Sequence, residues 1–193
     1  MHTFNDDYQA GVPPWDIGHP QPRFVTLGQS GAVQGSVLDV GCGTGENILY
    51  FASLGHEVWG IDSAPLAIER AQLKAAERSL SAQFLVHDAL DLVSLGRTFD
   101  TVIDSGLFHV FSDEQRPLFV ASLAQGLRPG GRYFMQCFSD QQPGDWGPRR
   151  VSQADIRGAF STGWRIDSLE EATFENHIEP SGSRSWFCSL TRL

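Results

Sequence analysis

Basic residues, cysteines and long apolar runs are all scarce in this 193-residue sequence. The 14 Lys and Arg residues are outnumbered by 23 Asp and Glu residues, which gives a formal charge of −9 and a pI near 5.0. Binding to phosphates requires clustered Lys and Arg, so the composition argues against a nucleic-acid partner. The cysteines, Cys42, Cys137 and Cys188, have no close pairing and suggest neither disulfides nor a zinc site.

Signals for targeting and for metal binding are missing as well. No apolar stretch approaches the ~20 residues that span a membrane, so we expect no membrane partner. The N-terminus carries acidic residues and prolines where a signal peptide needs a basic start, which favours the cytoplasm. Carboxylates and histidines are scattered without ligand spacing, so we expect a site without a metal. The expected oligomeric state is a monomer or a weak homodimer.

From residue 36 onward, short apolar runs alternate with helical patterns, which is typical of a parallel sheet covered by helices. A chain of this length, with 41% hydrophobic residues, suits a single domain. Seven strands are predicted, at Ser36–Val40, Glu57–Ile61, Ala82–Val86, Phe99–Ile103, Gly131–Phe138, Arg165–Thr173 and Ser185–Thr191. Four helices are predicted, at about Glu46–Leu54, Ala64–Leu80, Ser112–Leu127 and Ser152–Phe160. Ser63 and Ser112 are expected to cap the second and third of these helices. Two stretches rich in proline and glycine, Gln9–Pro22 and Ser139–Arg150, are predicted to be irregular.

The most informative segment is the decapeptide at residues 38–47, Leu-Asp-Val-Gly-Cys-Gly-Thr-Gly-Glu-Asn. Asp39 closes the first predicted strand, and three glycines follow at alternate positions: Gly41, Gly43 and Gly45. A turn through glycines into a helix brings free backbone N–H groups and a positive helix end close to a ligand. The spacing is not the G-x-G-x-x-G that cradles a dinucleotide pyrophosphate. Glu46 occupies the place of the third dinucleotide glycine, where an anion disfavours a diphosphate.

With Asp39 before it, this segment resembles the signature of the class I, Rossmann-like methyltransferases that use S-adenosyl-L-methionine. The resemblance covers about Val37 to Phe138. It implies an α/β fold, a doubly wound, mostly parallel seven-stranded sheet with helices on both faces and an antiparallel last strand. It also implies S-adenosyl-L-methionine as cofactor and S-adenosyl-L-homocysteine as product. An acidic wall would suit the sulfonium and ammonium groups, and exposed N–H groups would suit the carboxylate. The alternative is a tight turn that binds no ligand.

Further acidic residues follow the second and third predicted strands. Asp62 comes about twenty residues after the glycine turn, where a carboxylate reaches the hydroxyls of a ribose, and its neighbour Ser63 joins the candidate cofactor-binding set. NAD-binding proteins share this spacing. By resemblance, Asp88 accepts a hydrogen bond from the adenine amino group and the Ala89 N–H meets a ring nitrogen. The alternative for Asp88 is a solvated residue that starts a short helix.

The fourth predicted strand leads into polar residues that would lie beside the reactive methyl group, because ligands bind at the carboxyl ends of parallel strands. Asp104 and Ser105 can hold the methionine end or the substrate, which makes Asp104 a candidate for both cofactor binding and catalysis. His109 is the candidate general base, since imidazole titrates near neutral pH. The alternative for His109 is a histidine at the edge of the core, satisfied by the backbone.

The N-terminal residues 8–24 contain the pattern Pro-Trp-Asp-Ile-Gly-x-Pro-Gln-Pro. This pattern resembles the opening of the thiopurine, thiol and halide methyltransferase group, and of small bacterial quinone and phenol methyltransferases. The resemblance implies a lid over the cofactor, with Trp15 against the bound ligand and Asp16 lining the pocket. We therefore expect one methyltransferase domain over residues 1–193, with a lid segment at 1–30 and a catalytic core at 36–193.

The expected activity is transfer of a methyl group to a small-molecule nucleophile, an S, O, N or halide acceptor, by in-line displacement. Because the sulfonium is already activated, the protein mainly positions and desolvates the reactants. Three other functions remain open: a protein or RNA methyltransferase, an NAD-dependent oxidoreductase, and a cofactor-binding module without catalysis. The sequence does not identify the acceptor.

Overall fold

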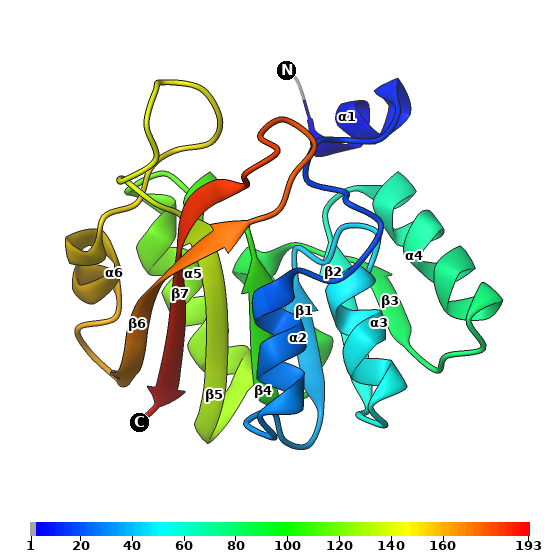
Figure 1. Ribbon diagram of the computed structural model, residues 1–193. Coiled ribbons are helices and arrows are strands. Elements are labelled where there is room, and N and C mark those ends of the chain that lie inside the picture. Colours follow the sequence, from blue (N-terminus) through cyan, green and yellow to red (C-terminus); the bar gives the residue numbers. More distant parts are fainter. Residues whose placement is uncertain (1–2) are drawn as a thin grey trace.

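Seven strands form a single sheet in the computed structural model, which describes residues 3–193 (Figure 1). The strands are β1 (Val37–Val40), β2 (Val58–Asp62), β3 (Gln83–Val86), β4 (Phe99–Ser105), β5 (Leu127–Phe138), β6 (Trp164–Phe174) and β7 (Ser183–Arg192). Their order across the sheet is β3-β2-β1-β4-β5-β7-β6. The strands β1 to β5 pair in parallel, and β7 runs antiparallel to both of its neighbours. The fold class predicted from the sequence is confirmed.

Helices cover both faces of this sheet, because alternate strand residues point to opposite sides and each side is apolar. The helices are α1 (Phe4–Ala10), α2 (Pro22–Gln29), α3 (Glu46–Ser53), α4 (Pro65–Glu77), α5 (Gln115–Gly126) and α6 (Gln153–Ala159), with the 3₁₀ helices η1 (Ala89–Leu95) and η2 (Phe108–Val110). One core cluster joins Ile103 of β4 to side chains of α2, α3 and α4. A second cluster joins Val102 to side chains of η1, α5 and α6. No helix within residues 3–193 combines the length and the apolar character needed to cross a membrane.

Two α-helices were not predicted from the sequence. The first, α1, begins after Thr3, whose N–H donates to the Asp6 carboxylate at 2.7 Å. The second, α2, begins at Pro22 and buries Phe24 and Leu27 in the core. Proline suits the first helical position, because the N–H it lacks has no partner there. Residues 22–29 of the expected lid at residues 1–30 therefore belong to the core. Residues 1–2 of that segment lie outside the described residues.

One helix boundary also differs from the prediction. The helix expected from Ser112 begins at Gln115, and Glu114 is its N-cap residue. The Ser112 hydroxyl still accepts a hydrogen bond from the Gln115 N–H, at 3.3 Å. The serine thus stabilises the start of α5 from outside the helix.

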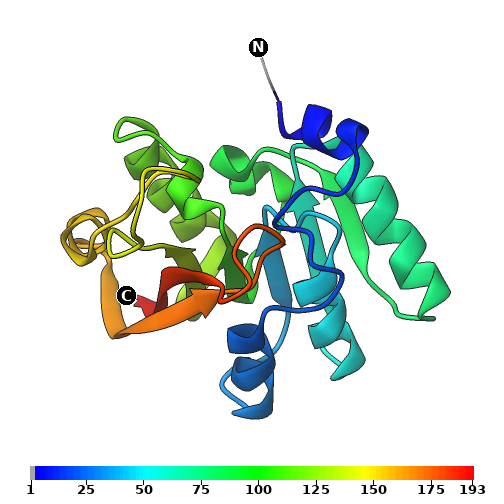
Figure 2. The same cartoon turned by 45° about the horizontal axis from the view of Figure 1, so that its top comes forward.

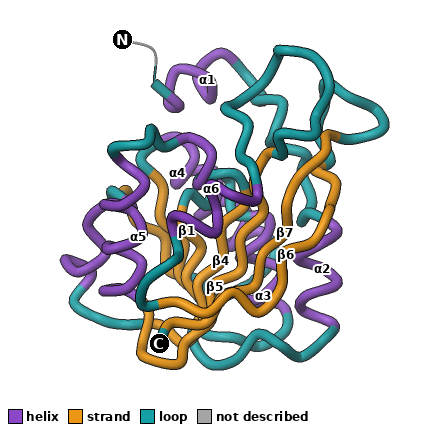
Figure 3. The backbone as a smooth tube through the Cα atoms, turned by 90° about the vertical axis from the view of Figure 1, so that its left-hand side faces the viewer, coloured by secondary structure: helices purple, strands orange, loops and turns teal. Residues whose placement is uncertain are grey.

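Three loop segments gather above the carboxyl ends of the parallel strands. They are residues 11–21, called the strap below, residues 139–152, and residues 175–182. Figure 2 shows the strap, in blue, meeting the orange-red loop 175–182 above the sheet. Figure 3 shows the same loops, in teal, at one end of the strands. In an open parallel sheet this end is where ligands bind.

Candidate active site

A cavity of about 710 Å³ lies at the carboxyl edge of the sheet, under the strap. Its volume falls in the range of small-molecule sites. Ten of the predicted site residues line it: Trp15, Gly41, Gly43, Gly45, Asp62, Ser63, Asp88, Ala89, Ser105 and His109. The other two, Asp39 and Asp104, are 1% and 0% exposed and are not part of its wall. The structure thus brings most of the predicted residues into one site.

The glycine turn after β1 adopts backbone conformations that favour glycine. The three residues have positive φ angles, at Gly41 (71°), Gly43 (53°) and Gly45 (85°). A Cβ atom on Gly43 would lie 2.9 Å from the Tyr8 hydroxyl, and one on Gly45 would lie 3.1 Å from the Ala71 Cβ. The turn therefore allows close approach of its backbone only while these side chains are absent.

The N–H groups of this turn are less free than expected. The Cys42 N–H donates to the Ile61 carbonyl at 2.9 Å, and the Gly45 N–H donates to the Cys42 carbonyl at 2.9 Å. The Gly43 N–H donates to the Asp62 carboxylate at 2.9 Å. These bonds hold the turn in shape, so a ligand carboxylate must use other donors.

Asp62, at the end of β2, fixes two neighbouring segments with its two oxygens. Oδ2 accepts from Gly43, and Oδ1 accepts from the Ala64 N–H at 2.8 Å, just before α4. The helix cap expected from Ser63 is therefore wrong, because Ala64 is the N-cap residue and Asp62 accepts the hydrogen bond instead. Burial raises the pKa of Asp62, and the backbone N–H bonds partly oppose this shift. Asp62 still lines the cavity.

The surroundings of Asp39 best test whether the site suits a positively charged ligand. Both of its carboxylate oxygens are buried and have no hydrogen-bond partner within residues 3–193. Burial, and then the nearby Asp104 and Asp62, raise its pKa well above the ordinary range. A buried carboxyl group without a partner is costly. A positive charge in the adjacent cavity would offset this cost, so the residues fit a sulfonium or ammonium group.

Glu46 does not present the free anion that the sequence suggested. It accepts two hydrogen bonds from the Arg78 guanidinium, at 2.8 and 2.9 Å, and Lys74 Nζ lies 2.7 Å away. Burial raises the pKa of Glu46, but these cationic partners outweigh it and hold the pKa below its usual value. The charge of Glu46 is therefore compensated, and only the glycine spacing argues against a diphosphate.

The strap carries Trp15 to the cavity and holds it there through aromatic contacts. The indole N–H donates to the Tyr8 hydroxyl at 3.1 Å, and the ring meets Phe4 edge-on at a centroid distance of 6.0 Å. Trp15 keeps 45% of its surface exposed. A tryptophan that served only to anchor the strap would bury more of its ring, so the exposed surface is available to a ligand.

Two residues that the sequence analysis did not assign fasten the strap. Gln21, 5% exposed, donates to the Glu175 carbonyl at 2.8 Å and accepts from the Glu175 N–H at 3.0 Å. The His177 N–H donates to the Pro14 carbonyl at 2.9 Å, and its Nε2 lies 3.0 Å from the Asp16 carbonyl. Such contacts join segments more than 150 residues apart, and local patterns give no signal for them.

Replacing Trp15 with alanine is expected to weaken cofactor binding about tenfold and to change stability little. The reason is that the ring leaves much of its surface uncovered in the free protein and would bury it against a ligand. Titration calorimetry with S-adenosylhomocysteine and chemical denaturation measure the two effects. An unchanged dissociation constant would remove Trp15 from the ligand site.

Asp104 lies behind the cavity wall. This position corrects the prediction that its side chain contacts the cofactor or the substrate. Its carboxylate accepts hydrogen bonds from the Leu107 N–H at 2.7 Å, the Phe108 N–H at 3.0 Å and the Tyr133 hydroxyl at 2.8 Å. Burial raises its pKa to about 7, against these three donors. The side chain thus fixes the turn from Ser105 to Phe108 rather than facing the cavity.

His109 lies at the other end of the cavity, 9% exposed. Its Nδ1 accepts a hydrogen bond from the Phe138 N–H at 3.0 Å. Burial, followed by the charge of Arg116, lowers the pKa of His109 to about 3. The imidazole is therefore neutral near pH 7. A role in proton transfer stays a prediction.

Aromatic side chains surround this end. Phe138 and Phe174 meet the His109 ring edge-on, at centroid distances of 6.1 and 6.2 Å. Trp146 packs edge-on against Phe138 at 5.9 Å. These rings and Phe111 line the cavity. They come from four separate segments, so no spacing along the chain marks them as one wall.

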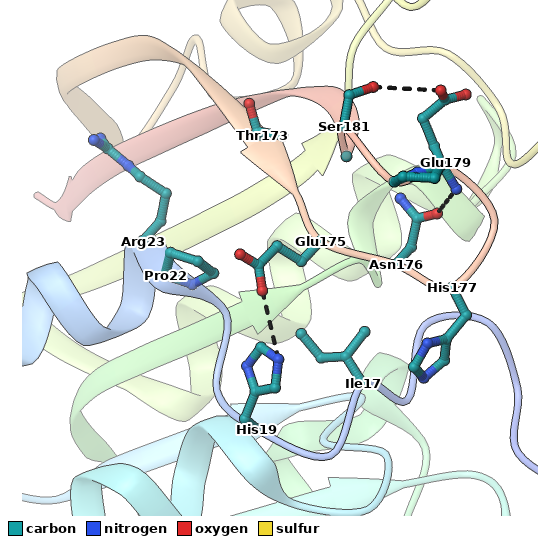
Figure 4. Close-up of a pocket in the computed structure, with 12 residues that line it drawn as sticks. Ile17, His19, Pro22, Arg23, Thr173, Glu175, Asn176, His177, Glu179 and Ser181 are labelled. Atoms are coloured by element: carbon teal, nitrogen blue, oxygen red, sulfur yellow. Dashed lines mark hydrogen bonds and ion pairs between the residues drawn. The ribbon is translucent and has the colours of Figure 1, made fainter.

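A second, outer pocket of about 530 Å³ lies between the strap and the loop 175–182 (Figure 4). His19 and Glu175 form an ion pair across it, with Nε2 and Oε2 3.5 Å apart. Both side chains are about half exposed, so the pair contributes little stability. This pocket contains neither the glycine turn nor the carboxyl ends of the parallel strands. The larger cavity is therefore the candidate active site.

Within residues 3–193, no three His, Cys, Asp or Glu side chains are arranged to hold a metal ion. A reaction without a metal remains a prediction from the sequence. The carboxylate acceptors in the cavity wall instead suit an organic cation with hydroxyl groups.

Comparisons with known proteins agree with this geometry. Residues 37–131 match the family described as "Methyltransferase domain". The chain is 39% identical to 2-heptyl-1-hydroxyquinolin-4(1H)-one methyltransferase of Mycobacteroides abscessus over 84% of this chain and 73% of that protein. It is 29% identical to probable thiol methyltransferase 2 of Arabidopsis thaliana over 77% of this chain and 66% of that protein. A solved structure described as "Conversion of a Disulfide Bond into a Thioacetal Group during Echinomycin Biosynthesis" superposes with a TM-score of 0.88 at 36% identity, covering 98% of this chain and 91% of that one.

Proposed function

Because the chain belongs to the methyltransferase family and is an S-adenosylmethionine-dependent methyltransferase of small molecules, we propose that its acceptor is a planar aromatic molecule with an ionisable hydroxyl group. The observation that carries this proposal is the aromatic wall around His109, formed by Phe111, Phe138, Trp146 and Phe174. Edge-on packing on such rings favours a flat aromatic ligand. The printed name of the Mycobacteroides abscessus relative, which describes a hydroxyquinolone, supports the same class of acceptor.

For the cofactor we propose the following arrangement. Asp62 accepts from the ribose hydroxyls, with Ser63 beside it, while Asp88 and the Ala89 N–H hold the adenine. Ser105 contacts the methionine end, the Asp39 carboxyl group behind the wall favours the positive charge there, and Trp15 covers the ligand. When bound, S-adenosylmethionine supplies an electrophilic methyl group on a positive sulfur. The hydrogen bonds of the glycine turn and of the turn from Ser105 to Phe108 fix the backbone at the two ends of the cavity. This fixed backbone favours alignment of the cofactor with the acceptor.

The support for adenine binding by Asp88 is its position in the cavity wall. Oδ1 accepts from the Leu90 N–H at 2.9 Å and so caps η1. Asp88 is exposed and lines the cavity, which leaves its second oxygen available to an amino group. Helix capping and ligand binding are therefore compatible at this residue.

We also propose that the protein works as a cytoplasmic monomer or weak homodimer, without a metal, a nucleic-acid partner or a membrane partner. The formal charge of −9 supports the statement on nucleic acids, since phosphates would be repelled. Sedimentation of the purified chain over a range of concentrations measures the oligomeric state.

The acceptor class is tested by following S-adenosylhomocysteine release over a panel of nucleophiles. Phenols and hydroxyquinolones are expected to turn over faster than alkyl thiols, aliphatic alcohols, halides and thiocyanate. Phe174→Ala is expected to lower kcat/KM for aromatic acceptors about tenfold, through lost ring contacts. Phe4→Ala, at the strap end of the cavity, is the matched control and should leave this acceptor preference unchanged. Fastest turnover with a halide or thiocyanate would contradict the proposed acceptor class.

A further inference from the structure

The imidazole of His109 is held in one protonation state by the backbone of β5. Its Nδ1 accepts the Phe138 N–H, and a neutral imidazole carries only one proton. That proton is therefore on Nε2. Within residues 3–193, Nε2 has no hydrogen-bond partner, and the ring lines the cavity next to Gly106. His109 thus presents an N–H donor to the cavity.

This arrangement leaves no ring nitrogen free to take a proton from a ligand. Nε2 already carries a proton, and protonation of Nδ1 would break the bond to Phe138. The surroundings also disfavour an imidazolium, because the ring is 9% exposed and lies between the edges of Phe138 and Phe174. A general base needs the opposite properties.

Positive side chains lie near this end of the cavity. Arg116 of α5 is 5% exposed, and its guanidinium is 5.1 Å from the ring centroid of Phe108, the residue before His109. Its Nε and one terminal nitrogen have no hydrogen-bond partner within residues 3–193, and its closest carboxylate, Asp113, is 3.5 Å away. Arg149, from the loop after β5, lines the cavity and also pairs with Asp113.

The acidic groups of the cavity lie on other segments. They belong to α1, the strap, the start of α3, the end of β2, the residues after β3 and the loop 175–182, and they are Asp7, Asp16, Glu46, Asp62, Asp88 and Glu175. Asp104 of β4 is turned to its own backbone donors and to Tyr133. None of these carboxylates hydrogen-bonds His109 in the described part of the chain. The charges next to His109 therefore favour an anion over a cation.

We propose that His109 donates a hydrogen bond from Nε2 to the nucleophilic oxygen of the acceptor, and that this oxygen binds and reacts as an anion. The inference rests on the proposed aromatic acceptor. The hydroxyl proton passes to solvent before binding. A lone pair of the oxyanion then forms the O–C bond, while the C–S bond breaks with its electron pair remaining on sulfur. No proton moves during methyl transfer. His109 therefore acts as a hydrogen-bond donor, not as the general base that the sequence predicted.

A series of substituted phenols of different acidity tests the proposal by kinetics. If the acceptor reacts as an anion, the midpoint of the rise of kcat/KM with pH moves with the pKa of each phenol. If a base on the enzyme removes the proton, the midpoint belongs to that base and is the same for every phenol. A constant midpoint overturns the proposal.

Binding of 4-nitrophenol to the complex with S-adenosylhomocysteine gives a readout that does not depend on turnover. The phenolate absorbs at longer wavelength than the phenol, so absorbance reports the pKa of the bound molecule. We expect this pKa to be about one unit below that of free 4-nitrophenol, because a buried donor and nearby positive charges stabilise the anion. Binding mainly as the neutral phenol, or no binding, overturns the proposal.

Two variants of His109 distinguish its role as a hydrogen-bond donor to the acceptor from its role in holding the local fold. His109→Gln places an amide N–H near the position of Nε2 and cannot act as a base, whereas His109→Asn can still accept the Phe138 N–H but does not reach the cavity as a donor. We expect His109→Gln to keep kcat/KM within about threefold, and His109→Asn to lower it about tenfold and return the pKa of bound 4-nitrophenol to its free value. Equal loss in both variants, with S-adenosylhomocysteine still bound, would indicate a base. If nitrophenolate binds as expected but no aromatic acceptor is methylated, the proposed acceptor class fails, while the hydrogen bond from His109 to a bound anion stands.

Discussion

Replacing Asp62 with alanine is expected to weaken S-adenosylmethionine binding about 10- to 100-fold. The carboxylate has two tasks in the proposed site. It accepts the Gly43 and Ala64 N–H groups at 2.9 and 2.8 Å, and it faces a cavity where a ribose would lie. Loss of a charged acceptor costs about 1.5–3 kcal/mol, which corresponds to this range of affinity. Titration calorimetry measures the change, and Asp91→Ala, an exposed acid outside the cavity wall, is the control.

A ligand lacking the ribose 2′-hydroxyl separates the two tasks of Asp62. In the unmodified protein, 2′-deoxy-S-adenosylhomocysteine should bind more weakly than the parent compound. In Asp62→Ala this difference should disappear, because the hydroxyl no longer has its acceptor. If the variant still discriminates between the two ligands, Asp62 holds the turn and does not contact the ribose.

The sheet and the position of the candidate cofactor residues at its edge could be predicted because their signals are local. Each parallel strand is a short apolar run, and each predicted acid or glycine follows directly in sequence, so the fold places Gly43, Asp62, Asp88 and Ser105 at one edge. The order of the strands then makes them neighbours. The place of these residues in the sequence is therefore enough to predict that they lie at one edge of the sheet.

The acceptor end could not be predicted in the same way. Phe174 follows His109 by 65 residues and meets it only because β6 joins the sheet through β7. The tautomer of His109 depends on a backbone N–H of β5, which no residue type reveals. The charge of Glu46 is cancelled by Arg78, 32 residues away. Each of these facts depends on distant contacts, and each changes the chemistry expected of a residue that the sequence analysis singled out.

The largest effect on stability is expected for Asp104→Ala, which should lower the free energy of unfolding by about 3 kcal/mol or more. The substitution leaves the N–H groups of Leu107 and Phe108 and the Tyr133 hydroxyl without their acceptor, and the Phe108 and Tyr133 donors are fully buried. An unsatisfied buried donor costs about 1–3 kcal/mol. Tyr133→Phe, which removes one donor and orphans none, should cost only about 0.5–1.5 kcal/mol. Chemical denaturation compares the two variants.

Asp104 also makes stability depend on pH in a defined direction. Burial raises its pKa in the folded state from 3.8 to about 7, so the native protein holds the proton more tightly than the unfolded chain. The resulting stabilisation is complete below about pH 4 and is lost as the pH rises through about 7. Asp104→Asn cannot titrate, so the stability advantage of the unmodified protein over this variant should shrink between pH 5 and pH 8. A constant difference over that range would mean that the three donors keep the carboxylate ionised throughout.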